Sequence, residues 1–213
     1  ANVAGVTLAG VLPLMASGRT VIELDDAGPG GTASGKRYVA TPASVDLDFF
    51  EVFQTPVLAG RGFVPRDTVA GANTVVVNNL FVNQLLDGRN AVGRRIRYRA
   101  EDSQASKEPA PWFEIVGVVG DLVPDPEAPM SMDNPGKPFV YHTLGSSRTL
   151  SYPLYLATHV RSGDPTSVLP ALHRIAAEIS PELRLSDIQR LDQGTSYDVR
   201  AWNGIANFIM LVS

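Results

Sequence analysis

The chain has 213 residues, a formal net charge of −4 at pH 7 and a mean hydropathy of +0.02, a balance typical of a globular protein with one large or two small domains. It contains no Cys, which excludes disulfides, thiol catalysis and Cys-ligated zinc. No basic tract has the density of a nucleic-acid footprint, and no apolar run approaches the ~20 residues of a membrane span.

The first third of the chain predicts strands followed by a short helix. Segments rich in apolar and β-branched residues are predicted as strands at 3–12, 19–24 and 36–43, with a loop at 25–35. Phe49, Phe50 and Phe53 then stand at helical spacing, which predicts a helix over 45–53 with Asp46 as its cap. Gly60 and Gly62 flank Arg61 in a predicted tight turn.

The middle of the chain is predicted to be mostly β. The expected strands are 74–78, 94–99, 112–119 and 139–142, and a short helix is expected over 80–86. The second and third of these strands predict an antiparallel hairpin with a long polar loop. Alternation places Arg95, Arg97 and Arg99 on one strand face, which we interpret as solvated. Adjacent acids such as Asp25 and Asp26 are also interpreted as solvated.

The last third predicts a β-α-β unit and a final helix. Residues 154–161 and 185–191 are the expected strands, and a helix begins after Asp164 with Pro165 in its first turn and ends at Ser180. Residues 194–213 are predicted as a last helix whose apolar content rises towards its end. The chain starts without Met and stops inside this apolar stretch, so we expect it to be a piece of a longer protein.

Four motifs occur in one order between residues 38 and 122. They are YVATPASVDLDFFEVFQTPVLAGRGFVPRD (38–67), VVVNNLFVNQLL (75–86), GRRIRY (93–98) and FEIVGVVGDL (113–122). This succession resembles the extracytoplasmic core domain of MacB/FtsX-like ABC transporter permeases. The resemblance covers nearly the whole chain, with departures at the polar loop 100–111 and the Pro-rich segment 124–138.

The resemblance implies an α+β fold in two parts. Residues 1–66 and 150–200 would form a porter-like βαβ subdomain, and residues 67–149 an inserted, mostly β subdomain of the kind called sabre-like. Residues 201–213 would be the start of a truncated transmembrane helix, with Trp202 at the membrane interface. We expect Thr74 to His142 to form a lobe separate from the sheet of the first subdomain.

The resemblance also implies a non-catalytic function. The domain would face the periplasm from the inner membrane and transmit an ATP-driven conformational change to a substrate or partner. Its expected partners are the membrane, through flanking transmembrane helices, a cytoplasmic ABC ATPase, a second permease copy, and an exported substrate or periplasmic protein. No nucleic acid and no cofactor are expected.

The residue types that form catalytic, cofactor or metal sites in other proteins do not occur in the required patterns in this sequence. His142, His159 and His173 lack the spacing of metal ligands, and no GxSxG motif occurs. The glycines at 28–32 and at Gly117 and Gly120 miss the phosphate-loop and dinucleotide patterns, and we interpret them as a loop and a strand-end turn. In the GlyArgGlyPhe turn, Phe63 is expected to anchor in the core and Arg61 to pair with an acid or with a carbonyl.

Two alternatives remain open at this point. A free-standing periplasmic binding or adaptor domain would have a signal peptide upstream in place of a membrane helix. A soluble hydrolase, the less favoured alternative, would gather acids, histidines and serines in one deep pocket.

Overall fold

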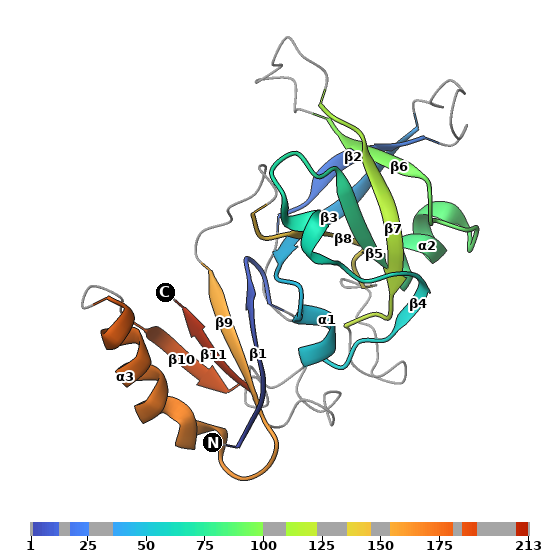
Figure 1. Cartoon of the computed structure of the whole chain (residues 1–213). Helices are drawn as coiled ribbons and strands as arrows, with labels where there is room; N and C mark the ends of the chain where they lie inside the picture. The colour runs from blue at the N-terminus through green and yellow to red at the C-terminus, as the bar shows by residue number, and fades with distance from the viewer. Residues whose placement is uncertain are drawn as a thin grey trace.

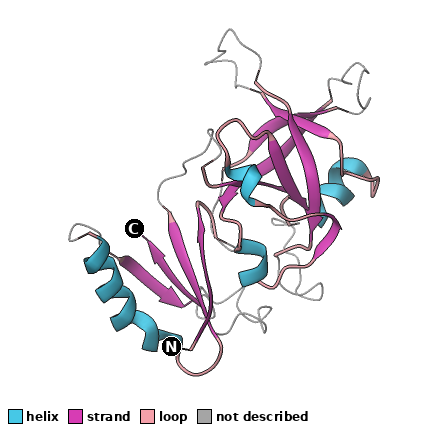
Figure 2. Cartoon of the chain, in the orientation of Figure 1, coloured by secondary structure: helices cyan, strands magenta, loops and turns pink. Residues whose placement is uncertain are grey.

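The computed structural model describes residues 2–12, 18–25, 36–99, 110–122, 136–145, 154–180, 185–190 and 208–212. Its strands gather in two lobes, as Figure 2 shows. One lobe carries the long helix and both chain ends, and the other contains most of the strands and the shorter helices (Figure 1). The mixed α+β architecture that the sequence predicts is confirmed.

The first lobe, called here the α/β lobe, is a four-stranded antiparallel layer with one helix. Its strands run in the order β10 (Ser186–Arg190), β11 (Phe208–Val212), β9 (Tyr155–Val160) and β1 (Val3–Ala9). Because β11 is antiparallel to both β9 and β10, those two strands run in the same direction with a strand between them. The expected β-α-β unit is therefore present in a split form.

Helix α3 (Leu169–Ile179) follows the 3-10 turn η2 (Pro165–Val168) in this lobe. The turn begins where the sequence predicts, because the Asp164 side chain accepts a hydrogen bond from the backbone N–H of Thr166 at 3.0 Å. Apolar residues of the turn, the helix and the sheet then share a small core, which includes Val160, Val168 and Leu172. The predicted helix and its two flanking strands are thus confirmed.

The second lobe is a closed barrel of six strands. They are β2 (Thr20–Leu24), β3 (Arg37–Val45), β5 (Thr74–Asn78), β6 (Arg95–Tyr98), β7 (Phe113–Val119) and β8 (Phe139–Thr143). The pairings run β3-β2-β6-β7-β5-β8, and β8 returns to β3 in parallel register from Thr41↔Phe139 to Val45↔Thr143. The ring of pairings closes on itself, so we call this the barrel lobe.

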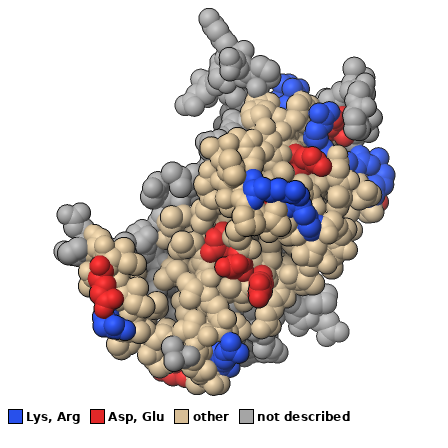
Figure 3. All heavy atoms as spheres, in the orientation of Figure 1, with Lys and Arg blue, Asp and Glu red and all other residues tan. Residues whose placement is uncertain are grey.

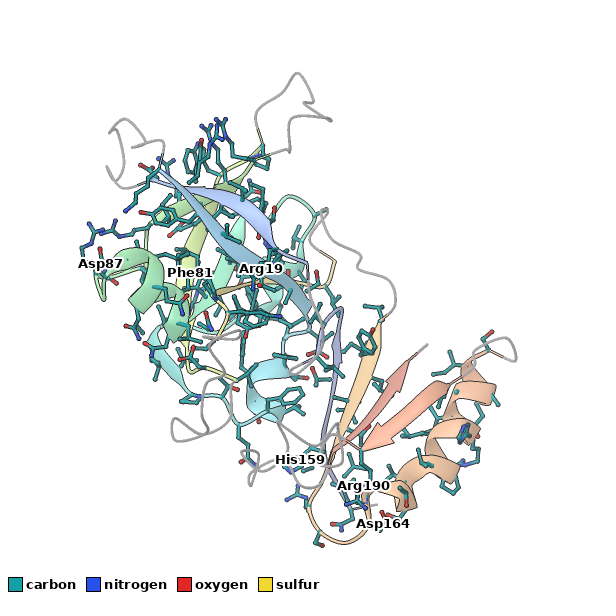
Figure 4. The ribbon with its side chains drawn as sticks, turned by 180° about the vertical axis from the view of Figure 1, so that it is seen from behind. Arg19, Phe81, Asp87, His159, Asp164 and Arg190 are labelled. Carbon is teal, nitrogen blue, oxygen red and sulfur yellow. The ribbon has the colours of Figure 1, made fainter. Side chains whose placement is uncertain are left out.

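Apolar side chains fill the barrel because strand residues alternate between its inside and its outside. Its core includes Ile22, Val77, Ile96 and Ile115, all fully buried. Helix α2 (Asn79–Leu86) contributes Phe81 to the same core, and Figure 4 shows this ring inside the lobe. The predicted hairpin of β6 and β7 is confirmed by the antiparallel pairs Arg95↔Glu114 and Ile96↔Phe113.

The structure divides the chain differently from the expected domain boundaries. Strands β2 and β3, which the sequence placed with the porter-like part in residues 1–66, pair inside the barrel lobe. We also expected the β-rich lobe to be separate from the sheet of the first subdomain. This expectation is wrong, since one path of strand pairings joins both lobes through Ala9↔Val45. Alternation reveals that a segment is a strand, but its partner depends on contacts far along the chain.

The predicted final helix is wrong where the structure describes it. Phe208–Val212 form β11, which pairs with β9 from Phe208↔His159 to Val212↔Tyr155. A short apolar run fits a buried strand and a helix equally well, and here β9 offers an open edge that needs a partner. The remainder of the expected transmembrane segment, including Trp202, lies outside the described residues.

Candidate functional site: the junction between the lobes

A helix of one turn, α1 (Phe49–Val52), is wedged where the two lobes meet. Phe49 and Phe50 of this helix and Phe53 after it are buried, as the sequence predicts, and the Phe49 and Phe53 rings lie 4.8 Å apart. Phe50 meets Tyr141 of β8 edge-to-face at 5.1 Å. The aromatic cluster thereby fixes α1 to the barrel wall.

The same cluster reaches across to the α/β lobe. Ala9 of β1 and Ala157 of β9 belong to one buried core with the phenylalanines and Tyr141. The backbone of β1 passes so close to α1 that a Cβ on Gly5 would lie 2.8 Å from Val52 Cγ2. One apolar core therefore spans the junction and holds both lobes.

Asp46 adds a polar connection at this junction. Its carboxylate accepts hydrogen bonds from the Leu8 backbone N–H at 2.7 Å and from the Thr7 hydroxyl, both on β1. The expected role of Asp46 as helix cap is wrong, because Asp48 occupies the cap position and Asp46 faces β1 instead. A carboxylate one residue beyond β3 binds whichever backbone donor lies nearest, and the sequence does not show that β1 supplies it.

The turn after β4 (Val57–Gly60), a strand that pairs with β7 of the barrel lobe, is held by an ion pair. Arg61 donates two hydrogen bonds to Asp67, from Nη1 to Oδ2 at 2.6 Å and from Nη2 to Oδ1 at 3.0 Å. The Val64 N–H and the Thr74 hydroxyl donate to the same carboxylate at 2.8 and 3.0 Å. The predicted pairing of Arg61 with an acid is confirmed, as is the burial of Phe63, whose ring stacks on Phe50 at 6.0 Å.

This arrangement sets the protonation of Asp67. Its burial alone would raise the pKa, but the hydrogen bonds from Arg61, the Val64 N–H and Thr74, together with the Arg61 charge, lower the pKa below its ordinary value. The carboxylate is 2% exposed and fully engaged in these bonds. Its geometry is that of a structural clamp between the 3-10 turn η1 (Pro65–Thr68) and β5, with no lone pair directed at an external ligand.

Gly117 has a packing role that the sequence did not reveal. It lies within β7, opposite Gly60, where β4 pairs antiparallel with β7. A Cβ on Gly117 would lie 1.9 Å from the Arg61 carbonyl oxygen, so only glycine fits. The interpretation of Gly117 as a strand-end turn is therefore wrong, while Gly120 does follow the strand directly.

The histidines lie on the predicted elements but in separate places. His142 of β8 is buried and bonds the Tyr98 hydroxyl through Nε2 at 2.6 Å. His159 lies on β9 in the α/β lobe (Figure 4), where partial burial and then the Arg161 charge lower its pKa. Within the described part of the chain, no three metal-binding side chains come together.

The arginine face of β6 differs from the solvated strand that the sequence predicts. Arg95 pairs with Asp25, and Arg97 and Arg99 both pair with Glu23 of β2. Both acids are buried, so the expectation of a solvated Asp25 is wrong. Alternation in β2 and β6 could have suggested the pairing, had the register Glu23↔Arg97 been known.

Several candidates named from the sequence lie outside the described residues: the glycines at 28–32, Asp26 and most of the two departing loops at 100–111 and 124–138. Among the residues that are described, no helix is long and apolar enough to cross a membrane.

Comparisons with known proteins agree with this architecture. The family model described as the MacB-like periplasmic core domain matches residues 5–188. A domain from Porphyromonas gingivalis, provisionally described as part of a permease, has a TM-score of 0.51 at 15% identity, over 100% of this chain and 77% of that one. The periplasmic region of MacB from Actinobacillus actinomycetemcomitans has a TM-score of 0.53 at 11% identity, over 99% of this chain and 72% of that one. No curated protein matches the chain. At these identities the solved structures show a shared fold.

Proposed function

Because this chain belongs to the family of MacB-like periplasmic core domains, periplasm-facing domains of ABC transporter permeases, we propose that it passes on an ATP-driven movement to a substrate or partner without catalysis. The movement would originate in a cytoplasmic ABC ATPase and reach the domain through membrane segments of the permease, anchored in the inner membrane. Two permease copies would move together.

The continuous core across the junction is the observation that supports this proposal. Ala9 and Ala157 of the α/β lobe share one cluster with Phe49 and Tyr141 next to the barrel wall. Close-packed interiors deform little, so a displacement of one lobe is transmitted to the other. A flexible linker between the lobes would instead absorb the displacement.

The hydrogen bonding of polar groups in the described residues supports the proposal that the domain works without catalysis. The Asp67 carboxylate accepts four hydrogen bonds within the protein. Asn78 similarly accepts from the Phe81 and Phe139 N–H groups and donates to the Lys137 carbonyl. Such engaged groups stabilise the fold and are not poised for proton transfer to a substrate.

The test uses the full transporter with a spin label on the barrel lobe. Asn83 on α2 is exposed, and the described domain adds no cysteine of its own, so Asn83→Cys gives one label in each domain copy. Pulsed electron resonance then measures the distance between the two labels with and without ATP. We expect ATP to change this distance, because the proposed movement of the permease's membrane segments would displace the two domains and the barrel lobes with them.

Two matched variants assign the coupling to the junction. Asp46→Ala removes the bonds to Thr7 and Leu8, and it should reduce the ATP-dependent change in distance while ATP hydrolysis continues. Asp48→Ala, two residues away on an exposed side chain with no cap hydrogen bond, should behave like the wild type. An unchanged label distance in the wild-type transporter on ATP binding would contradict the proposal.

The lack of catalysis has its own test. A broad esterase, phosphatase and glycosidase screen of the isolated domain should show no turnover above background. Turnover that disappears on mutation of a single side chain would favour the hydrolase alternative.

A further inference from the structure

The outer face of β6 carries three arginines over two buried acids. Arg95, Arg97 and Arg99 have side chains that are 42%, 25% and 44% exposed, whereas Asp25 and Glu23 beneath them are 4% and 3% exposed. A partner that approaches this face therefore meets guanidinium groups first. Burial of two carboxylates is costly unless each is paired, which explains why arginines cover them.

One carboxylate orients two of the arginines. Arg97 Nε donates to Glu23 Oε2 at 2.5 Å, and Arg99 Nε lies 2.8 Å from Glu23 Oε1. A guanidinium has five N–H donors, so a bond at Nε leaves further donors for a second acceptor. The pairing with Glu23 thus fixes both side chains without exhausting their capacity to bind an anion.

The Trp112 ring contacts Arg97 and Arg95 from the side. Its ring centroid is 4.7 Å from the Arg97 guanidinium carbon and 5.7 Å from that of Arg95. Stacking on an aromatic face restricts the rotamers of arginine while the charge remains available. Because the side chains are already ordered, binding loses less conformational entropy than it would at a mobile basic surface.

The sign of this face is opposite to that of the whole protein. The chain has a net charge of −4, yet the described residues give this face the exposed side chains of Arg95, Arg97 and Arg99, with Arg37 of β3 next to Glu23 in register. Among the residues that the structure describes, Glu114 of β7 is an acid at the border of the face, opposite Arg95. Figure 3 shows Lys and Arg side chains gathered on the barrel lobe, several of them at its end far from the termini.

We propose that this face docks an extended acidic segment of a partner protein. Alternate residues of a strand are separated by about 6.6 Å, so the three arginines match carboxylates at alternate positions of an extended peptide. Both edges of β6 are occupied, by β2 and β7, so the segment would lie on the outer face, along the direction of β6, and would not add a strand to the sheet. This recognition goes beyond the proposed transmission of movement and does not depend on it.

The test uses Trp112 as a reporter in the intact chain. The sequence has two tryptophans, and Trp202→Phe leaves Trp112 as the only one. A short alternating Glu-Thr peptide is titrated at low salt while Trp112 fluorescence and the anisotropy of a dye on the peptide are followed. We expect saturable binding that weakens with salt, and no binding of the matched Gln-Thr peptide.

Variants locate the binding on this face. Arg99→Gln leaves Arg97 to pair with Glu23 and should weaken peptide binding about tenfold, the loss of one charge-assisted contact. Arg97→Lys keeps the charge and the ion pair with Glu23 but loses the planar guanidinium that stacks on Trp112, and it should weaken binding less than Arg99→Gln. Arg174→Gln on α3 removes an equally charged, exposed arginine elsewhere and should leave binding unchanged. Melting curves of each variant confirm that it is folded.

Three outcomes would overturn the proposal. If Arg174→Gln weakens binding as much as Arg99→Gln, the peptide responds to overall charge and not to this face. If Arg99→Gln binds like the wild type while folded, the arginines do not dock the segment. If vesicles of anionic phospholipid change Trp112 fluorescence and the acidic peptide does not, the face binds a membrane surface and the proposed partner is wrong.

Discussion

Asp67 shows how a single buried carboxylate holds a turn. It accepts two bonds from Arg61 and one each from the Val64 N–H and Thr74, which outweigh the cost of its burial and lower its pKa. A group with a lowered pKa in the folded state stabilises the protein above its unfolded pKa, about 3.9, and this contribution disappears as the pH falls through the folded pKa.

Asp67→Asn should therefore lower stability at neutral pH by about 2–3 kcal/mol, the value of hydrogen bonds to a charged group. The same variant should lose less further stability in acid than the wild type, because its side chain does not titrate. Denaturant unfolding at pH 7 and at about pH 3 measures both effects. An unchanged acid response in Asp67→Asn would mean that other carboxylates dominate acid unfolding.

A side chain at position 117 would clash with backbone atoms, which cannot move aside as a side chain can. A Cβ at this position would lie 1.9 Å from the Arg61 carbonyl oxygen, so β4 must move away from β7. We expect Gly117→Ala to destabilise the protein by about 3 kcal/mol, as overpacking does. Gly18→Ala is the matched control, because no atom lies within 4 Å of its added methyl group. Equal melting temperatures for the two variants would contradict the close approach.

At the scale of the element, helix α1 depends on its tertiary contacts. Four residues are too few for a stable isolated helix, so Phe49 and Phe50 hold it in place by packing. Phe50→Ala should cost about 3–5 kcal/mol, the range for a buried aromatic residue. Glu51→Ala, on the exposed side of the same turn, should have an effect within about 0.5 kcal/mol. A small effect of Phe50→Ala in urea unfolding would mean that the junction repacks around the cavity.

The sequence predicted which segments form helices and strands better than it predicted which residues contact one another in the fold. The Phe49, Phe50 and Phe53 spacing identified the buried side of α1, and alternation identified the strands of the hairpin that contains Arg97. Asp46 and Arg97 were not interpreted correctly, because their partners Leu8 and Glu23 are distant in the chain. The apolar run that ends at Val212 was assigned to a helix, since periodicity does not separate a short buried strand from a helical segment.

At the scale of the whole molecule, the two lobes share one core and should unfold together. The Ala9↔Val45 pair and the phenylalanine cluster connect them, so neither lobe loses its structure without exposing apolar surface of the other. Calorimetry should show one transition with equal calorimetric and van't Hoff enthalpies. Two separate transitions in the wild type would show that the junction is weaker than its packing suggests.

The same pair offers a covalent test of the junction. The flanking bonds run from the Gly10 N–H to the Ser44 carbonyl and from the Asp46 N–H to the Leu8 carbonyl, so Ala9 and Val45 form a non-hydrogen-bonded pair. Such pairs have Cα atoms about 4.5 Å apart, within the range of a disulfide. Ala9→Cys combined with Val45→Cys should oxidise and raise the melting temperature, and reduction should reverse the gain. Failure of the pair to oxidise would mean that the lobes do not meet in this register.

The pairing of β1 with β9 has a consequence for how the protein is made. β1 is synthesised before every strand of the barrel, yet its main partner strand, β9, begins only at Tyr155, after the last barrel strand has emerged. The barrel can therefore complete its ring while β1 has only its Ala9↔Val45 pair with β3, and the α/β lobe assembles last. Contacts between such distant segments form slowly because a long loop must close before they are made. The nascent chain thus carries β1 largely unpaired until β9 has been made.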